Sequence, residues 1–461
     1  MVTTITWIIV FVLIVGIGMF AGKSMSNSKQ WTGGDKTLSA IGVGCVLGAW
    51  QIGGMSVVGA AQNGYTMGIA GSWYSLAGGI YLLVAAGLAK ILRDRMPGDS
   101  VPTYLVSRFS TSSSKLYSYV WVILGFLYIP VQLKTVASVI QIAVPNLDAN
   151  WAIVLGLAIA TVYTAFSGMK GAASVGKVVC IGIYILLIGF VAIILPHFGG
   201  YSGLVASLPQ GYGELSSMPT QKWVGWLLSG ILSSVVMQSV LQPIMAAKDA
   251  KAARGGCIIG YVFAAPICIF TAIIGMMGAA TTSNLGNGAT AFAWTIKEYT
   301  SPVMAGVIFA VATMIIAATM ATMMMATGTI ITNIYKTQVN KEASEEKMLK
   351  VSRYGTLIFS ACTLIPAFLL PSAALTTTFQ ILIQCSTGPV SFSILAGLLW
   401  KRTTKQASLA SMISGIIVGL IWVISGLSNQ IETIYAVIVV SYGVGIITTL
   451  LTSKKENAIQ A

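Results

Sequence analysis

The chain has 461 residues, of which 56% are apolar and only 8% are charged, and its formal net charge at pH 7 is +14. Soluble proteins average about 45–50% apolar and about 25% charged residues, so this composition excludes an ordinary soluble protein and indicates a polytopic membrane protein. The basic excess could also suit nucleic-acid binding, but the positions of the charges argue against it.

Thirteen apolar segments divide the chain, and each is long enough for a membrane helix of about 20 residues. The segments are approximately 3–22, 38–64, 68–91, 116–145, 150–168, 174–197, 222–246, 255–281, 301–335, 352–371, 374–400, 408–427 and 432–452. No soluble domain interrupts them. The sequence therefore predicts an all-α polytopic membrane protein with about 13 transmembrane helices and a single transporter-like domain over residues 1–461.

The basic residues are distributed unevenly between the connections. If the N-terminus lies outside, the external connections hold only Lys222 and Lys297, while Lys134 and Lys177 lie within segments and the other 22 basic residues are internal. Cytoplasmic connections of membrane proteins carry such an excess of Lys and Arg. The pattern predicts a bacterial inner-membrane protein with an external N-terminus and a cytoplasmic C-terminus, with the lipid bilayer and no nucleic acid as partner.

All twelve acidic residues fall in connections, at helix ends or in the C-terminal tail. The predicted membrane core therefore holds no combination of His, Asp and Glu that could activate a nucleophile. The sequence predicts that the chain is not an enzyme. It also predicts no cofactor, apart from a coupling ion that could be sodium or a proton, and no obligate protein partner.

The second apolar segment contains the step Gln51-Ile52-Gly53-Gly54, at which a helix would easily break. A glycine inside a helix costs about 1 kcal/mol relative to alanine, and unpaired backbone groups are tolerated in the bilayer only where they line a cavity or bind something. Interrupted helices near the midplane form the sites of many secondary transporters. We therefore expect a broken helix and a binding site at this step.

Four motifs then follow in order along the chain, at 58–70, at 163–170, at 238–242 with 246–249, and at 397–402. With these motifs the chain resembles the sodium:solute symporter family over essentially its whole length. The resemblance implies a leucine-transporter-type fold with two inverted five-helix repeats, at 38–197 and 222–400. One N-terminal helix, 3–22, precedes the repeats and two helices within 408–452 follow them. Alternating access around a central site is implied as well.

The resemblance also implies a cation site. Two backbone carbonyls at the break of the first core helix match Ala49 and Ile52, and oxygen ligands suit a hard cation such as sodium. The eighth core helix supplies the remaining ligands, for which two alignments are open. One alignment gives Ile315, Ala318 and Thr319 and keeps one hydroxyl. The other gives Met314, Ala317 and Ala318 and keeps none.

The fifth core helix departs from the family pattern at Gly176 and Lys177. The family commonly places an Asp at the position of Gly176, so the local charge changes by two units, and sodium should bind poorly. One hypothesis is that the ammonium of Lys177 replaces the cation and that proton release and uptake drive the cycle. In the alternative, Lys177 extends to cytoplasmic water.

Several polar and aromatic residues fall on segments that line the site in this fold: Gln51, Ser56, Trp73, Tyr74, Ser233, Ser234 and Gln238. Lys134 lies roughly 15 Å from the outer end of its segment, a depth at which we expect it to face the cavity and to pair with a substrate carboxylate. Alternatively, Lys134 binds helix-end carbonyls or Gln132. The sugar-binding pattern of the family is absent, because Ser75 and Gly230 stand at its Glu and Asn positions.

The sequence therefore predicts a secondary active transporter for a small polar solute that carries a carboxylate, such as an amino acid or an organic acid. Coupling to sodium and coupling to protons both remain open. A membrane sensor that binds a solute without moving it is the alternative from another class of protein.

Overall fold

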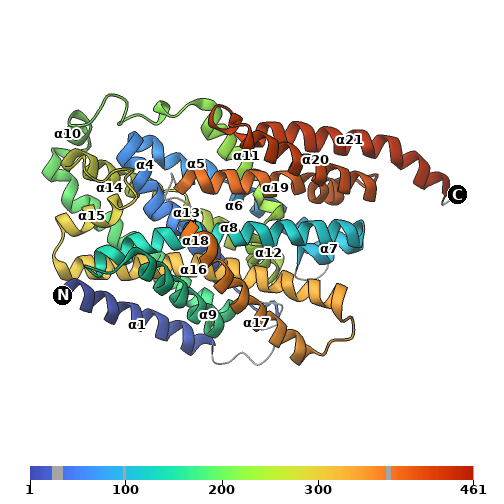
Figure 1. The fold of residues 1–461 in the computed structure, drawn as a ribbon, viewed down its shortest axis with the longest axis horizontal. Coiled ribbons are helices and arrows are strands. Elements are labelled where there is room, and N and C mark those ends of the chain that lie inside the picture. Colours follow the sequence, from blue (N-terminus) through green and yellow to red (C-terminus); the bar gives the residue numbers. More distant parts are fainter. Residues whose placement is uncertain (23–34, 97–99, 370–374, 460–461) are drawn as a thin grey trace.

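The computed structural model describes residues 1–22, 35–96, 100–369 and 375–459, and every regular element within them is helical. The long helices run side by side along one axis (Figure 1). The N-terminus, α10 and α15 lie at one end of this bundle, and α7 and the end of α21 lie at the other (Figure 1). Because the two chain ends lie at opposite ends of the bundle, the chain crosses its length an odd number of times.

The first part of the chain forms the outer helix α1 and a series of shorter elements that ends in the long helix α8. Their bounds are α1 (Val2–Gly22), α3 (Ala40–Ile52), η1 (Met55–Gly59), α4 (Ala60–Met67), η2 (Gly68–Ser72), α5 (Trp73–Gly78), α6 (Tyr81–Arg95), α7 (Val101–Arg108) and α8 (Thr111–Ala143).

The middle of the chain begins with α9, whose helix is interrupted at Gly168 by a left-handed φ of 52°. Its elements are α9 (Ala149–Ile194), η3 (Leu195–Phe198), α10 (Gly200–Ala206), η4 (Leu215–Ser217), α11 (Thr220–Val236), α12 (Gln238–Met245), α13 (Ala250–Ala264), α14 (Ile267–Thr281) and α15 (Ala291–Tyr299).

The last part contains α16 (Pro302–Ile334), η5 (Tyr335–Val339), α17 (Glu345–Cys362), α18 (Leu364–Leu369), α19 (Leu375–Leu399), α20 (Lys405–Ile424), η6 (Leu427–Asn429) and α21 (Thr433–Ile459). Residues 370, 371 and 374, at the ends of two predicted segments, lie outside the described residues.

By length and hydropathy, 10 of the described helices could cross a membrane, or 11 if the bent pair α11 and α12 forms one span. This confirms the predicted all-α membrane architecture, whereas the count of thirteen and the two inverted repeats stay predictions. Two predicted segments are interrupted near a glycine. The first part of 38–64 is the shorter apolar helix Ala40–Ile52, and its second part belongs to the candidate span Met55–Arg95; the segment 150–168 corresponds to the shorter helix Ala149–Ala165.

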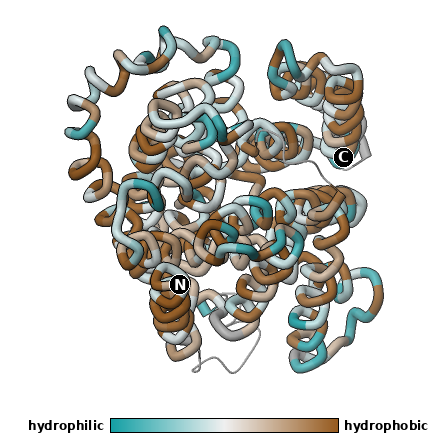
Figure 2. Tube along the Cα trace, turned by 60° about the vertical axis from the view of Figure 1, so that its left-hand side comes forward, coloured by the Kyte–Doolittle hydropathy of each residue, from teal (hydrophilic) through white to brown (hydrophobic). Residues whose placement is uncertain are grey.

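Burial distinguishes the centre of the bundle from its periphery. The most apolar window of α16 is 83% buried and that of α8 is 78% buried, whereas the corresponding values are 17% for α1 and 28% for α21. Hydrophobic residues cover most of the helices, and hydrophilic residues gather mainly at turns and helix ends (Figure 2). The outer helices α1 and α21 thus present apolar side chains to their surroundings, as expected in a bilayer.

Three arginines from α6 and α7 bind the carboxyl ends of two other helices. Arg93 donates hydrogen bonds to the carbonyls of Ile244 and Ala247, at 3.0 and 2.8 Å, where α12 ends. Arg95 binds the Leu398 carbonyl and Arg108 the Gly397 carbonyl, where α19 ends. Helix ends leave carbonyls without partners within the helix, and cations are favourable there. The arginines therefore fasten α12 and α19 to one neighbouring pair of helices.

Candidate functional site

The predicted break in the second apolar segment is confirmed. Helix α3 ends at Ile52, and Gly53 has a non-helical ψ of −164° before the chain continues as η1. A Cβ at Gly53 would overlap the side chain of Thr319, and one at Gly54 would overlap that of Thr135. Glycine is thus required here because α16 and α8 approach the backbone closely from two sides.

The polar groups freed by the break are bound by side chains from the protein interior. The Gly54 N–H donates to Oε1 of Gln132 at 3.0 Å, and Nε2 of Gln132 donates to the Tyr128 hydroxyl at 2.8 Å. The Ser56 hydroxyl donates to the Gln51 carbonyl at 2.6 Å. Because buried backbone groups without partners are costly, these bonds allow an open helix at this depth.

A cavity with a volume of about 40 Å³ lies beside the break, between α3, α5, α6, α8, α11 and α19. A single water needs roughly 10–15 Å³ by this measure, so the space holds a few waters in this conformation. Its lining residues are Trp50, Gln51, Gly53, Met55, Tyr74, Gly78, Tyr81, Tyr128, Gln132, Ser229, Gly230, Ser233, Met237, Phe379, Gln380 and Ile383.

Aromatic rings form much of the cavity wall. Tyr128 stacks on Trp50 with ring centroids 5.5 Å apart and lies 5.2 Å from Phe379. Tyr74 meets Phe379 edge to face at 5.9 Å. Such pairs fix the ring positions, so the cavity has a firm apolar wall with amide and hydroxyl groups between the rings.

One polar group of the wall is available for a ligand. The Ser229 hydroxyl is buried and has no hydrogen-bond partner among the described residues. A buried polar group without a partner is costly, and functional sites are one place where such groups persist. The lining residues within the described part of the chain are all uncharged, so hydrogen bonds rather than ion pairs would orient a solute there.

Three of the eight predicted substrate-binding residues line this cavity: Gln51, Tyr74 and Ser233. Two others bond elsewhere in the protein. Trp73 stacks on Trp223 at 4.7 Å and donates from Nε1 to the Leu215 carbonyl at 2.9 Å. The hydroxyl of Ser234 donates to the Ile231 carbonyl at 2.6 Å.

The remaining three predicted residues also lie outside the lining of the cavity. Ser56 is fully buried, and its carbonyl accepts a hydrogen bond from Thr271 at 2.8 Å. Oε1 of Gln238 accepts from the Val101 N–H at 3.0 Å, which ties α12 to the start of α7. Lys134 is half-buried on α8.

Three of the predicted cation-site positions converge at the break. The Thr319 hydroxyl lies 2.9 Å from the Ala49 carbonyl and 3.0 Å from the Ile315 carbonyl, and donates toward both. Ile52 is the last residue of α3, and the Ala318 carbonyl accepts a hydrogen bond from Thr322 at 2.9 Å. Of the two alignments left open by the sequence, the one with Thr319 places a hydroxyl against α3.

This oxygen set suits a hard cation in chemical type, because it consists of backbone carbonyls and one hydroxyl. It is smaller than the family pattern, since Ala318 has no side-chain oxygen. Gly176 of α9 packs against the carbonyl of Cys45, in the first half of α3. A Cβ at Gly176 would crowd that carbonyl. The neighbouring Lys177 side chain is exposed.

Sequence reasoning missed most of the wall, including Tyr128 and Gln132 of α8 and Phe379 and Gln380 of α19. One signal was present for α8, because Gln132 is a polar residue one helical turn after Tyr128 in a mainly apolar segment. In α19, Gln380 is the corresponding polar residue beside an aromatic ring. Neither signal specifies which other helix the side chain meets.

Comparisons with known proteins agree with the fold. The family model described as the sodium:solute symporter family matches residues 31–415. Among similar proteins, an uncharacterized symporter of Bacillus subtilis, YodF, is 24% identical over 89% of this chain and 85% of its own length. The sodium/glucose cotransporter of Vibrio parahaemolyticus is 23% identical over 88% of this chain and 82% of its own length.

The solved structures show the same fold. A sodium-coupled sialic acid symporter in a substrate-bound outward-open state superposes with a TM-score of 0.82, at 16% identity, over 98% of this chain and 97% of that one. Mhp1, a nucleobase-cation-symport-1 family transporter in a closed conformation, gives 0.57 at 13% identity, over 91% and 92% of the two chains. With the family match over most of its length, the chain belongs to the sodium:solute symporter family.

Proposed function

We propose that the chain is a secondary active transporter that moves a small polar solute across the bacterial inner membrane by alternating access. The observation that supports this most is the broken helix α3 at Gly53, which opens onto the cavity between α8, α11 and α19. A second break supports it, because α11 and α12 bend by 49° at Met237, which also lines the cavity. Discontinuous helices at a shared cavity are typical of secondary transporters.

We further propose that the solute carries a carboxylate, as an amino acid or an organic acid does. The amino ends of η1 and α12 lie at the two breaks, and helix amino ends favour negative charge. The free hydroxyl of Ser229 and the amides of Gln51 and Gln380 add donors in the wall. Pairing of the carboxylate with Lys134 would require this half-buried side chain to turn toward the cavity.

Two coupling modes are compatible with the cation position. The carbonyls of Ala49, Ile52 and Ile315 with the Thr319 hydroxyl would hold a sodium ion, and the bond between Thr319 and Ala49 supports this mode. The second mode replaces sodium by the ammonium of Lys177 and links transport to protons. The loss of oxygen ligands at Ala318 and Gly176 supports the second mode, whereas the exposure of Lys177 supports its alternative role as an interfacial lysine.

The proposed orientation places the N-terminus outside and the C-terminus in the cytoplasm. The opposite positions of the two chain ends support an odd number of crossings (Figure 1). The distribution of Lys and Arg supports the direction, because the end of the bundle with α7 holds most of them. The test replaces Lys222 and Lys405 singly by cysteine and treats intact cells with a thiol reagent that does not cross the membrane. In the proposed orientation, the cysteine at position 222 reacts and the cysteine at position 405 does not.

The experiment that tests the proposed function is uptake into proteoliposomes that contain the purified protein. A thermal-unfolding screen of amino acids, organic acids and sugars first identifies the solute, because a ligand at 100 times its dissociation constant stabilises by about 2.7 kcal/mol. Uptake of the labelled solute is then measured with an inward sodium gradient, with an inward proton gradient and with neither. Binding without uptake under all three conditions would instead identify a sensor.

The same assay separates the coupling modes when Lys177→Gln is included. Sodium-driven uptake that survives in this variant supports the oxygen site. Sodium-independent uptake that is lost in the variant supports replacement of the cation by Lys177. Lys251→Gln, a change of the same kind at an exposed lysine of α13, is the matched control.

A further inference from the structure

A second cavity lies on the outside of the bundle, between the first half of α9 and the first turns of α17. Its volume is about 440 Å³, which is far larger than that of the central cavity. We call it the α9–α17 groove; the residues that matter for its chemistry are Thr161, Ala165, Glu346, Lys350, Arg353 and Leu357. None of these residues lines the central cavity or belongs to the predicted cation site.

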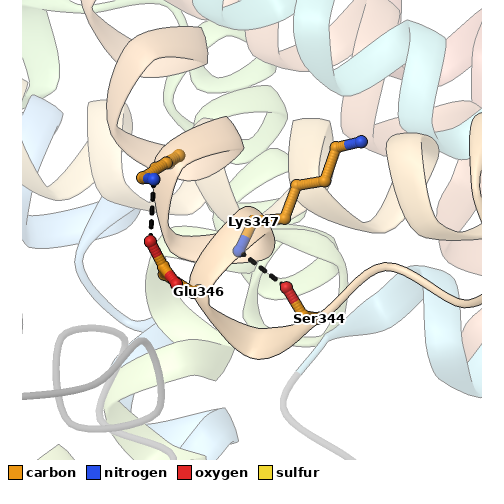
Figure 3. A network of polar contacts seen from close by, with 4 residues as sticks. Ser344, Glu346 and Lys347 are labelled. Carbon is orange, nitrogen blue, oxygen red and sulfur yellow. Dashed lines mark hydrogen bonds and ion pairs between the residues drawn. The ribbon is translucent and has the colours of Figure 1, made fainter.

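The groove has a charged end and an apolar end. Glu346 and Lys350 form an ion pair of 2.7 Å on the first turns of α17, next to the Ser344 hydroxyl that accepts from the Lys347 N–H (Figure 3). Arg353 lies at the same end. With one carboxylate and two cations, the charged end has a net charge of +1 and can accept an anion.

The apolar end lies deeper along the same helix. Leu357 comes seven residues after Lys350, which corresponds to two turns or roughly 10 Å along α17. Leu357 is partly exposed, at 38%, and faces Ala165 of α9 across the groove. The groove thus joins a cationic region to an uncharged region that is lined by Leu357 and Ala165 together with Thr161, Thr164 and Thr356.

The position of the groove in the bundle indicates which molecules reach it. The candidate span Glu346–Leu369 begins at the charged end of the groove, and the apolar helix Ala149–Ala165 forms the opposite wall with its last residues. Arg353 and Tyr354 are exposed, so the groove opens outward from the bundle rather than into its core. In the proposed orientation, this opening faces the cytoplasmic leaflet, at the depth of the lipid headgroups.

We propose that the α9–α17 groove binds an anionic phospholipid of the cytoplasmic leaflet. Its phosphate lies between Lys350 and Arg353, and an acyl chain follows Leu357 and Ala165. Basic pockets between membrane helices on the cytoplasmic side are suited to anionic headgroups. Free phosphate would use the same two cations but would leave the apolar half of the groove unfilled, so the lipid is the occupant that matches both halves.

The test measures binding to the full-length protein in detergent by the shift of its thermal unfolding midpoint. Three additions are compared at equal ionic strength: dioleoyl phosphatidylglycerol, dioleoyl phosphatidylcholine and inorganic phosphate. We expect phosphatidylglycerol to raise the midpoint most. Each basic residue near an anionic headgroup contributes a factor of roughly five, so Lys350→Gln with Arg353→Gln should weaken binding by about twenty-five-fold.

Two further variants keep the result decisive. Lys251→Gln with Lys405→Gln removes the same charge from exposed positions on α13 and α20 and should bind phosphatidylglycerol like the wild type. Ala165→Trp leaves both cations in place but fills the apolar half, so it should also abolish the shift. Equal stabilisation by phosphatidylcholine, equal stabilisation by inorganic phosphate, or unchanged binding in the Lys350 and Arg353 double variant would each overturn the proposal. The assignment to the cytoplasmic leaflet rests on the proposed orientation, but the readout requires no transport, so failure of lipid binding and failure of the proposed transport are distinguishable.

Discussion

The hydroxyl of Thr319 lies 2.9 Å from the carbonyl of Ala49 and joins α16 to the last turn of α3. Thr319 is fully buried, and the side chain stands where a Cβ on Gly53 would have to fit. The contact therefore connects the central helix of the bundle with the break that opens the cavity. A change at Thr319 is therefore expected to affect both the predicted cation site and the shape of the break.

Replacement of Thr319 by Val should remove the only side-chain oxygen of the predicted cation site while keeping its volume. A hydrogen bond or ligand interaction with a charged group contributes about 1.5–3 kcal/mol, so we expect the sodium concentration for half-maximal uptake to rise about tenfold or more. Thr319→Ser should restore most of the affinity. Thr322→Val is the control, because the Thr322 hydroxyl bonds within α16 to the Ala318 carbonyl. Identical sodium dependence in Thr319→Val and wild type would contradict the sodium site.

Replacement of Gly54 by Ala should destabilise the protein, because the new Cβ would overlap the side chains of Thr135 and Gln132. Overpacking of a tight interior costs about 1–3 kcal/mol. The thermal unfolding midpoint should fall and uptake should be lost. Gly87→Ala on α6 is the matched control, since a Cβ there meets nothing within 4 Å. Equal midpoints for the two variants would show that the close packing at the break is not required.

Replacement of Ser229 by Ala separates a binding role from a structural one. Its hydroxyl has no partner among the described residues, so its removal should leave stability unchanged or raise it slightly. The affinity for the solute should fall, and KM should rise about tenfold while kcat changes little. Ser234→Ala is the control, because the Ser234 hydroxyl bonds to its own helix away from the cavity. A lower unfolding midpoint with unchanged KM in Ser229→Ala would assign a structural role.

Glu432, between α20 and α21, should make stability depend on pH. Burial raises the pKa of its carboxyl above the usual 4.5, against the opposing effects of the Gln384 hydrogen bond and the Lys222 charge. The folded protein therefore binds this proton more tightly than the unfolded chain, and stability falls as the pH rises through the raised pKa. Glu432→Gln should be more stable than the wild type at neutral pH, and this difference should disappear below pH 4.5.

Thermal unfolding measured between acid and neutral pH checks this effect of Glu432. Glu298→Gln on α15, at an exposed position, is the control and should show no such difference. In Glu432→Gln, the new amide oxygen can still accept the hydrogen bond from Nε2 of Gln384, which is 2.6 Å long in the wild type. A wild type that gains stability relative to Glu432→Gln as the pH rises would reverse the sign and exclude this explanation.

The sequence predicted the break because local chemistry determines it. Each glycine of the Gly53-Gly54 step costs about 1 kcal/mol inside a helix relative to alanine, and the nearby Gln51 needs a polar partner within the bilayer. The register of α16 could not be chosen in the same way. The helix is buried on all sides between Ala305 and Ile330, so no polar face distinguishes Thr319 from Ala318, and only its contact with Ala49 does so.

The wall of the cavity was harder to predict for a related reason. Gln132 and Phe379 lie far apart in the chain and reach one cavity only through the packing of α8 against α19. Gln238 was predicted to bind solute because it falls on a segment that lines the site in this fold, and in the structure its amide oxygen accepts a hydrogen bond from the Val101 N–H at the start of α7. A polar residue in an apolar segment indicates a partner, and the sequence does not say whether that partner is a solute or a backbone group.

The arginines at the carboxyl ends of α12 and α19 have a mechanical consequence. Both helices follow or border the cavity, and both are held by the same neighbours, through Arg93 on one side and Arg95 and Arg108 on the other. If either helix end moved outward alone, a guanidinium group and the helix-end carbonyls that it binds would lose their hydrogen bonds. In the proposed transport cycle, opening at this end of the bundle would therefore either move α6 and α7 together with α12 and α19 or break both sets of hydrogen bonds.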